Sequence, residues 1–226
     1  NLITSPTDVT AVSWGTYNST ILFGEDDIGQ YIYSDIGTNL RCVTYEEHAD
    51  IAAGSYSMVC IVKQKDNRYF FLELAGASAT QNYGVVFDLE SGVATDENIL
   101  NVTQYKNTIT SLGNGLWSLS VTVKTTSTGI LYPLIGLSDQ ATPIYSNNAP
   151  KYTGDGKGVY VFGVQVTATP YPLPTNTSGS AWADDTDHVI EDIETAAPEL
   201  WTALDGVVDG VELVTNGDCE SAMPTM

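Results

Sequence analysis

The sequence predicts an all-β protein in which two sheets pack against each other, and three observations support this fold class. Hydrophobic residues make up 42% of the 226 residues but charged residues only 16%, and the remainder is rich in Thr, Ser, Asn and Gly. This composition favours strands and turns over long helices. Short apolar runs recur with turn residues between them. Several of these runs alternate apolar and polar residues, which is typical of a strand with one buried face.

Nine apolar runs are expected to be strands, which is enough for two packed sheets. They lie at 20–24, 30–36, 40–45, 56–63, 69–75, 83–88, 116–124, 130–137 and 158–167. Turn sequences such as Ser91-Gly92 and Gly113-Asn114-Gly115 separate them, and these residue types adopt positive φ at little cost. The pattern is that of a sandwich or barrel rather than of an alternating α/β protein.

The alternation also predicts which face of a strand is buried, because residues i and i+2 share one face. The expected inward residues are Phe70, Leu72 and Leu74; Trp117, Leu119, Val121 and Val123; and Tyr160, Phe162, Val164 and Val166. The opposite face of strand 69–75 then holds Tyr69, Phe71 and Glu73.

The composition changes near residue 170. Prolines at 170, 172 and 174 precede a stretch rich in Thr, Ser and Asn, which predicts the end of the globular domain. Residues 182–226 then hold twelve of the 28 acidic residues and none of the eight basic ones. We expect a domain at 1–176 and an acidic linker at 177–210, which is either a short amphipathic helix or disordered.

The totals disfavour several classes of function. A formal charge of −20 should repel nucleic-acid phosphates and anionic lipids. No apolar stretch approaches the roughly 18 residues of a membrane span. Cys42, Cys60 and Cys219 lack the spacing of a zinc site or a disulfide framework. We therefore expect no nucleic-acid partner and no membrane insertion.

Five fragments of the chain form an ordered series. They are NLIT at 1–4, FDLESG at 87–92, LGNGLWSLSV at 112–121, YTGDG at 152–156 and VYVFGVQV at 159–166. Together they resemble the carbohydrate-binding-like jelly rolls of tailed-bacteriophage structural proteins. The resemblance implies an antiparallel two-sheet jelly-roll β-sandwich, here with an acidic C-terminal extension. ELVTNGDCES at 212–221 is similar to the opening strand of such a module, so 211–226 is expected to be the start of a further one in a longer chain.

The resemblance also implies a function. It predicts a non-enzymatic virion protein in a tail fibre, a tailspike, a head fibre or a capsid decoration. We expect such a protein to lie at the surface of the virion and to form a homo-oligomer. It is also expected to contact other virion proteins and to bind a glycan on the host surface. The alternative is a carbohydrate-binding module of a secreted polysaccharide-degrading enzyme, which would share the fold.

Catalytic machinery is sparse in the sequence. His48 and His188 are the two histidines, and both fall in acidic segments where a solvated position is expected. Glu73 and Asp88 lie on predicted strands and are the carboxylates considered for glycoside hydrolysis, which needs two acids about 5–10 Å apart. A hydrogen-bonding or surface role is the preferred interpretation of both, so no catalytic residue is expected.

Two kinds of binding site remain as candidates. Sugar recognition needs aromatic rings beside carboxylates or amides. This combination occurs at Tyr69, Phe71 and Glu73 and again at Tyr31, Tyr33 and Asp35. The competing interpretation is that these rings cover a second sheet face or a subunit contact. No cofactor is expected, although Ca²⁺ has a weak candidate site in Glu25-Asp26-Asp27, which lacks the spaced ligands of a calcium loop.

Overall fold

The computed structural model describes residues 2, 14–17, 19–23, 30–34, 40–153, 156–170 and 172, without the side chains of residues 17, 20–23, 30–34, 40–42, 49 and 50. Several predictions lie outside these residues. They are the calcium candidates Glu25, Asp26 and Asp27, the acidic linker at 177–210 and the further module at 211–226.

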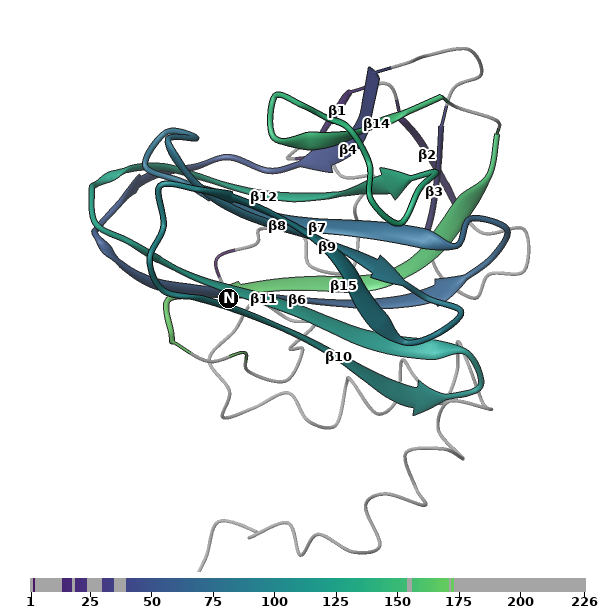
Figure 1. Cartoon of the computed structure of the whole chain (residues 1–226). Helices are drawn as coiled ribbons and strands as arrows, with labels where there is room; N and C mark the ends of the chain where they lie inside the picture. Colours follow the sequence, from purple (N-terminus) through teal and green to yellow (C-terminus); the bar gives the residue numbers. More distant parts are fainter. Residues whose placement is uncertain are drawn as a thin grey trace, which may run out of the picture.

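Two antiparallel sheets form a jelly-roll β-sandwich, which confirms the predicted fold class (Figure 1). The first sheet has the order β13-β14-β4-β12-β7-β8-β9, with β1 paired to β4 and β5 paired to β12. Its strands are β1 (Gly15–Tyr17), β4 (Leu40–Tyr45), β5 (His48–Ile51), β7 (Tyr69–Gly76), β8 (Gln81–Asp88), β9 (Val93–Leu100), β12 (Gly129–Ser138), β13 (Tyr145–Ser146) and β14 (Ala149–Tyr152).

The second sheet has the order β10-β11-β6-β15-β3-β2. Its strands are β2 (Ser19–Phe23), β3 (Gln30–Ser34), β6 (Gly54–Gln64), β10 (Tyr105–Gly113), β11 (Leu116–Thr125) and β15 (Gly158–Thr167). All nine predicted strands coincide with strands of the structure. The prediction missed β1, β5, β9, β10, β13 and β14, which are short or polar and lack an apolar run.

The main core lies between the two sheets, and the predicted faces of β7 and β11 are confirmed. Phe70, Leu72 and Leu74 are fully buried in this core, as are the three aliphatic residues of the predicted inward face of β11. Trp117 is half-buried and packs against the edge of the core, where the end of its indole ring lies over Gly92. A Cβ on Gly92 would lie 2.5 Å from that ring, so this turn requires glycine for space as well as for its φ of 71°.

The predicted inward face of β15 is half wrong. The core residues of this strand are Val159 and Val161 in its first half and Val164 and Val166 in its second half. A register shift between Val161 and Gly163 inserts one residue, and a β-bulge of this kind exchanges the two faces of a strand. Tyr160 therefore faces away from the main core.

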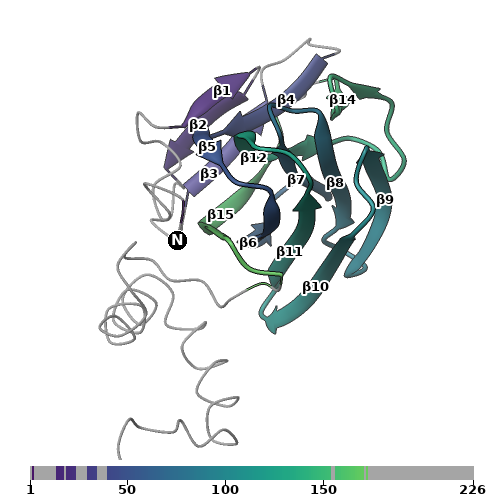
Figure 2. The same ribbon diagram turned by 90° about the vertical axis from the view of Figure 1, so that its left-hand side faces the viewer.

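A second apolar cluster lies on the outer face of the first sheet. It contains Val43, Phe71, Ala75, Val86, Leu134 and Ala149, with Tyr45, Tyr69, Tyr132 and Tyr145 packed around it. The hairpin of β13 and β14 lies beside β4 and over this face, as the two views show (Figures 1 and 2). The hairpin thus covers part of the outer face of the first sheet and shields it from solvent. The covered part lies next to a pocket.

Candidate functional site

A pocket of about 230 Å³ lies on the outer face of the first sheet. Its lining residues are Tyr45, Glu47, Glu73, Ala75, Ala79, Asn82, Tyr132, Leu134, Asn147 and Asn148. At about 30 Å³ for each water, the volume corresponds to roughly eight water molecules. The pocket is therefore the size of one small polar molecule or of one unit of a larger one.

Strand register brings the lining residues together, since they are distant in sequence. Tyr45 on β4 lies opposite Leu134 on β12, and Leu134 lies opposite Glu73 on β7. The neighbouring row runs from Tyr132 on β12 to Ala75 on β7 and on to Asn82 on β8. Residues of two such rows on one face are close neighbours in a sheet.

Two tyrosine rings form the aromatic side of the pocket. The ring centroids of Tyr45 and Tyr132 are 6.4 Å apart with an interplanar angle of 62°, an edge-to-face contact. Burial, together with the charge of Glu47 and the presence of Tyr45, raises the pKa of Tyr132. Its hydroxyl therefore stays neutral in neutral solution and can both donate and accept a hydrogen bond.

Two buried polar side chains face these rings across the apolar residues Ala75 and Leu134. Glu73 is 1% exposed and Asn82 is 0% exposed. Neither Nδ2 nor Oδ1 of Asn82 has a hydrogen-bond partner in the described protein. Buried amides are nearly always paired, and an unpaired donor or acceptor costs about 1–3 kcal/mol. Within the described residues the Asn82 amide therefore has no partner, and water or a ligand in the pocket can supply one.

The tip of the β13–β14 hairpin contributes the two asparagines. Asn147 and Asn148 have φ values of 49° and 68°, the geometry of a two-residue type I′ turn. Asn98 Nδ2 donates to the Asn148 carbonyl at 2.8 Å, and Tyr145 Oη donates to Asp96 Oδ2 at 2.8 Å. Both bonds join the hairpin to β9, so this rim of the pocket is held in place.

The same hairpin covers Phe71. The rings of Phe71 and Tyr145 are 6.3 Å apart, and Phe71 is fully buried between the hairpin and the sheet. The Phe71 ring lies over Gly84, where an added Cβ would be 2.6 Å from Phe71 Cζ. Gly84 thus leaves space for the Phe71 ring, which packs against Tyr145 of the hairpin.

The turn between β7 and β8 is strained where it borders the pocket. Ala77, Ser78 and Ala79 have φ values of 48°, 58° and 61°, in the left-handed region that non-glycine residues rarely adopt. Several bonds hold the turn, including Ser78 N to the Ile130 carbonyl at 3.0 Å and Thr80 Oγ1 to the Ala77 carbonyl at 2.7 Å. The turn places Ala79 in the pocket wall.

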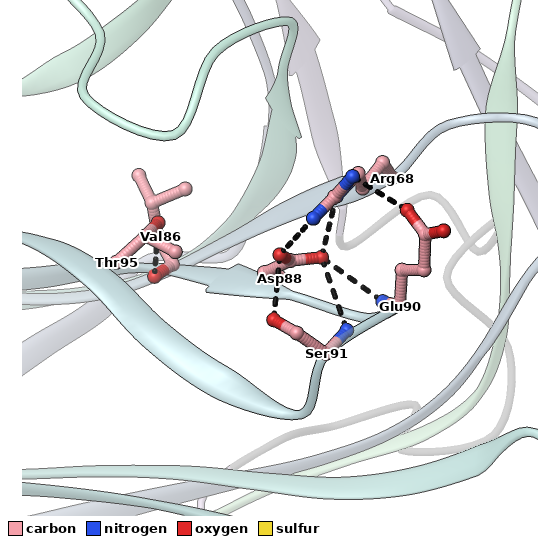
Figure 3. Close-up of polar contacts among 6 residues, drawn as sticks. All are labelled: Arg68, Val86, Asp88, Glu90, Ser91 and Thr95. Atoms are coloured by element: carbon pink, nitrogen blue, oxygen red, sulfur yellow. Dashed lines mark hydrogen bonds and ion pairs between the residues drawn. The ribbon is translucent and has the colours of Figure 1, made fainter.

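The carboxylates considered for catalysis are not arranged as a pair. Glu73 lies opposite Gly84, and Asp88 is four residues further along β8, which is about 13 Å in an extended strand. Asp88 is instead part of an ion-pair cluster (Figure 3). Arg68 donates to both of its oxygens, from Nε at 2.8 Å and from Nη2 at 2.6 Å.

Asp88 also organises the turn that follows β8. Its Oδ1 accepts from the backbone N–H of Glu90 at 3.0 Å, and its Oδ2 accepts from Ser91 Oγ at 2.6 Å. Arg68 Nη1 also lies 2.6 Å from Glu90 Oε2. The bond from Arg68, with those from Ser91 and Glu90, lowers the pKa of Asp88 against the opposing effect of burial. A carboxyl held ionised in this way is a structural anion and is unsuited to donate a proton.

Of the residues predicted for sugar binding, Glu73 lines the pocket. Tyr69 and Phe71 share its sheet face but do not line the pocket, and the burial of Phe71 leaves no ring face open to solvent. Tyr31 and Tyr33 lie on β3 in the other sheet, and their side chains are outside the described ones. Alternation could assign Tyr132 to the same face as Leu134, but no sequence pattern indicates the register of β12 against β7 and β8.

His48 differs from its expected solvated position. It begins β5 and is half-buried, with Nε2 3.7 Å from Oε2 of the buried Glu46. Burial lowers the pKa of His48, while Glu46 acts in the opposite direction. Within the described residues, no group of three or more His, Cys, Asp or Glu side chains is placed to hold a metal ion. That same part of the chain contains no helix with the length and apolarity needed to cross a membrane.

Comparisons with known proteins identify a weak similarity to one solved structure. No protein-family model matches the chain, and no curated protein matches it. Among solved structures, the chain is similar to TmCBM61, described in complex with β-1,4-galactotriose, at 10% sequence identity and a TM-score of 0.28. The match covers 72% of this chain and 98% of that one.

Proposed function

We propose that the β-sandwich is a non-catalytic carbohydrate-binding domain and that the pocket on its outer sheet face is the ligand site. One observation carries the proposal: Asn82 presents a buried amide with no partner among the described residues, on a pocket that also holds two tyrosine rings. Specific ligand pockets combine apolar and aromatic walls with a few polar groups that fix orientation. A sugar suits this arrangement, because its C–H face packs on an aromatic ring while its hydroxyls bond to amides and carboxylates.

A glycan array of the whole chain, followed by calorimetric titration of the glycans that bind, tests the proposal. Tyr132→Ala and Asn82→Leu should each weaken binding at least about tenfold, because one removes a ring and the other removes the amide. Tyr69→Ala is the matched control, since Tyr69 lies on the same sheet face outside the pocket. Loss of binding in Tyr69→Ala with retention in Tyr132→Ala would place the site at the residues predicted from sequence and refute the pocket.

The biological setting that we propose is the surface of a bacteriophage virion, where the domain would be an oligomeric fibre, spike or capsid decoration that contacts a host glycan. The ordered sequence fragments that resemble phage jelly rolls support this setting. A secreted polysaccharide-degrading enzyme is the alternative setting. Immunolabelling of intact virions tests the first, and a catalytic domain in the parent protein would favour the second.

A further inference from the structure

The last strands of the two sheets leave some of their inner side chains open to solvent. Strand β9 ends the first sheet and β10 ends the second, and the two are neighbours at this edge of the sandwich (Figure 2). Four residues of these strands lie opposite core residues of the adjoining strands, so their side chains point to the inner side of the sheets. They are Glu97 and Ile99 on β9 and Tyr105 and Asn107 on β10, and we call them the β9–β10 seam.

An aromatic ring forms an accessible platform in the seam. The rings of Tyr105 and Tyr83 are stacked with their centroids 4.8 Å apart and an interplanar angle of 36°. Tyr83 is fully buried, whereas Tyr105 is 43% exposed and Ile99 beside it is 41% exposed. The buried ring therefore supports the inner side of the Tyr105 ring, and the rest of that ring remains open to a ligand.

A set of hydrogen bonds fixes the polar groups beside this platform. Tyr83 Oη donates to Glu97 Oε1 at 2.9 Å. Asn107 Nδ2 donates to Tyr83 Oη at 2.7 Å and to Glu97 Oε1 at 2.6 Å. These bonds use the hydroxyl proton of Tyr83 and both protons of the Asn107 amide. Among the described residues, Glu97 Oε2 and Asn107 Oδ1 have no hydrogen-bond partner, and both are acceptors.

Addition of a strand from another protein is the less favourable use of this edge. Exposed edge strands attract such pairing, but bulges and charged side chains discourage it. The pairing of β9 with β8 and that of β10 with β11 each contain a register shift. Asp96 on β9 and Lys106 on β10 place charge on both strands. These features favour a ligand that is bound by side chains over one that pairs with the backbone.

We infer that the β9–β10 seam is a second sugar-binding site, where one sugar unit packs on Tyr105 and donates hydroxyl hydrogen bonds to Glu97 and Asn107. A sugar fits because its C–H face suits the ring and its hydroxyls supply the donors that the two open acceptors need. The inference rests on the proposed carbohydrate function and adds a site to it. Asn82 lines the pocket and the next residue, Tyr83, supports the seam, so the two sites lie on opposite faces of one sheet edge.

A glycan array probed in parallel with the whole chain and its variants tests the inference, followed by calorimetric titration of the glycans that bind. Tyr105→Ala should weaken binding at least about tenfold, whereas Tyr105→Phe, which keeps the ring, should stay within about twofold. Glu97→Gln should also weaken binding, because an amide nitrogen replaces the open acceptor while the other oxygen can keep its bonds to Tyr83 and Asn107. Val93→Ala is the matched control, since Val93 is an exposed apolar residue of β9 outside the seam.

Comparison with the pocket variant Tyr132→Ala separates the two sites. Weakened binding in Tyr105→Ala and Glu97→Gln, with unchanged binding in Val93→Ala, supports the seam. Binding that is lost in Tyr132→Ala but unchanged in Tyr105→Ala and Glu97→Gln overturns the inference and keeps the pocket. Absence of binding by the unmodified chain to every glycan on the array refutes both the second site and the carbohydrate function itself.

Discussion

Replacing Asn82 with Leu tests whether the unpaired Asn82 amide destabilises the folded protein, as expected of a group that serves ligand recognition. Leu has the branching of Asn but no polar atoms. Asn82 is 0% exposed, and its two amide atoms lack protein partners, so the substitution removes no hydrogen bond made by this side chain within the described protein. The backbone of residue 82 remains paired with Ala75 and Leu100 in the neighbouring strands. The adjoining pocket gives the larger side chain space.

The expected gain follows from the cost of the unpaired amide. An unsatisfied buried polar group costs about 1–3 kcal/mol, and replacing it by an apolar group of similar shape removes that cost. We therefore expect Asn82→Leu to raise the free energy of unfolding by about 1–3 kcal/mol. For a domain of this size, that corresponds to a rise in Tm of roughly 3–9 °C.

Asn67 provides a matched control, because it is also a buried asparagine but has all its partners. Its Nδ2 donates to the carbonyls of Tyr69 at 2.6 Å and Ser138 at 3.1 Å, and its Oδ1 accepts from Tyr152 Oη at 3.4 Å. Asn67→Leu removes all three of these bonds. At about 1 kcal/mol for each lost bond, we expect a loss of about 3 kcal/mol. The same change in residue type should thus have opposite signs at the two positions.

Denaturant unfolding of the whole chain and of both variants measures these differences, with ligand titration in parallel. The expected result for Asn82→Leu is higher stability together with lost glycan binding. If Asn82→Leu were as destabilised as Asn67→Leu, the Asn82 amide would have a stabilising partner in the free protein. That result would show that the Asn82 amide is not an unpaired recognition group.

Three further predictions concern the elements around the pocket. Arg68 lowers the pKa of Asp88, so the stabilisation from this ion pair should be complete above the unfolded pKa near 4 and should decrease as the pH falls toward the lower pKa of the folded state. The free energy of unfolding should therefore differ less between pH 7 and pH 3 in Asp88→Asn than in the unmodified chain. Ala79→Gly should raise the free energy of unfolding by about 0.5–1 kcal/mol, because glycine adopts the left-handed backbone conformation of residue 79 without strain. Ala94→Gly in strand β9 should lower the free energy of unfolding by a similar amount, because glycine loses more backbone freedom in a strand than alanine. Gly84→Ala should displace the Phe71 ring and cost about 1–3 kcal/mol in thermal or denaturant unfolding, and an unchanged Tm would show that the ring is not confined.

Sequence patterns predicted those parts of the fold whose signal is local. The alternation of Phe70, Leu72 and Leu74 identified a buried face, because a strand between two layers needs apolar residues at every second position. The same rule failed for β15, because a bulge near Phe162 exchanges the faces and leaves no local mark in an almost wholly apolar strand. The strands β9 and β10 were missed because their exposed, polar sequences resemble loops.

The candidate site could be predicted only in part, because it depends on register between distant strands. Glu73 was identified by its chemistry beside aromatic residues. Its pocket partners Tyr45 and Tyr132 come from β4 and β12, and only the pairing of β4 with β12 and of β12 with β7 makes them neighbours. The adjacent pair Asn147-Asn148 was a usable local signal, since asparagine is favoured where both turn residues need positive φ.

Two features that reduce stability occur together at the pocket, and this supports a role in binding. In the part of the chain that the structure describes, the Asn82 amide has no partner, and the turn that carries Ala79 has three consecutive left-handed residues. Local departures from stable structure persist where the surrounding fold compensates for them, and they tend to occur at functional sites. Here the bonds from β9 to the β13–β14 hairpin and from β12 to the β7–β8 turn supply that support. Because the walls are held in place before a ligand arrives, binding should require little ordering of the protein, which favours the proposed binding of a sugar in a pocket of this small volume.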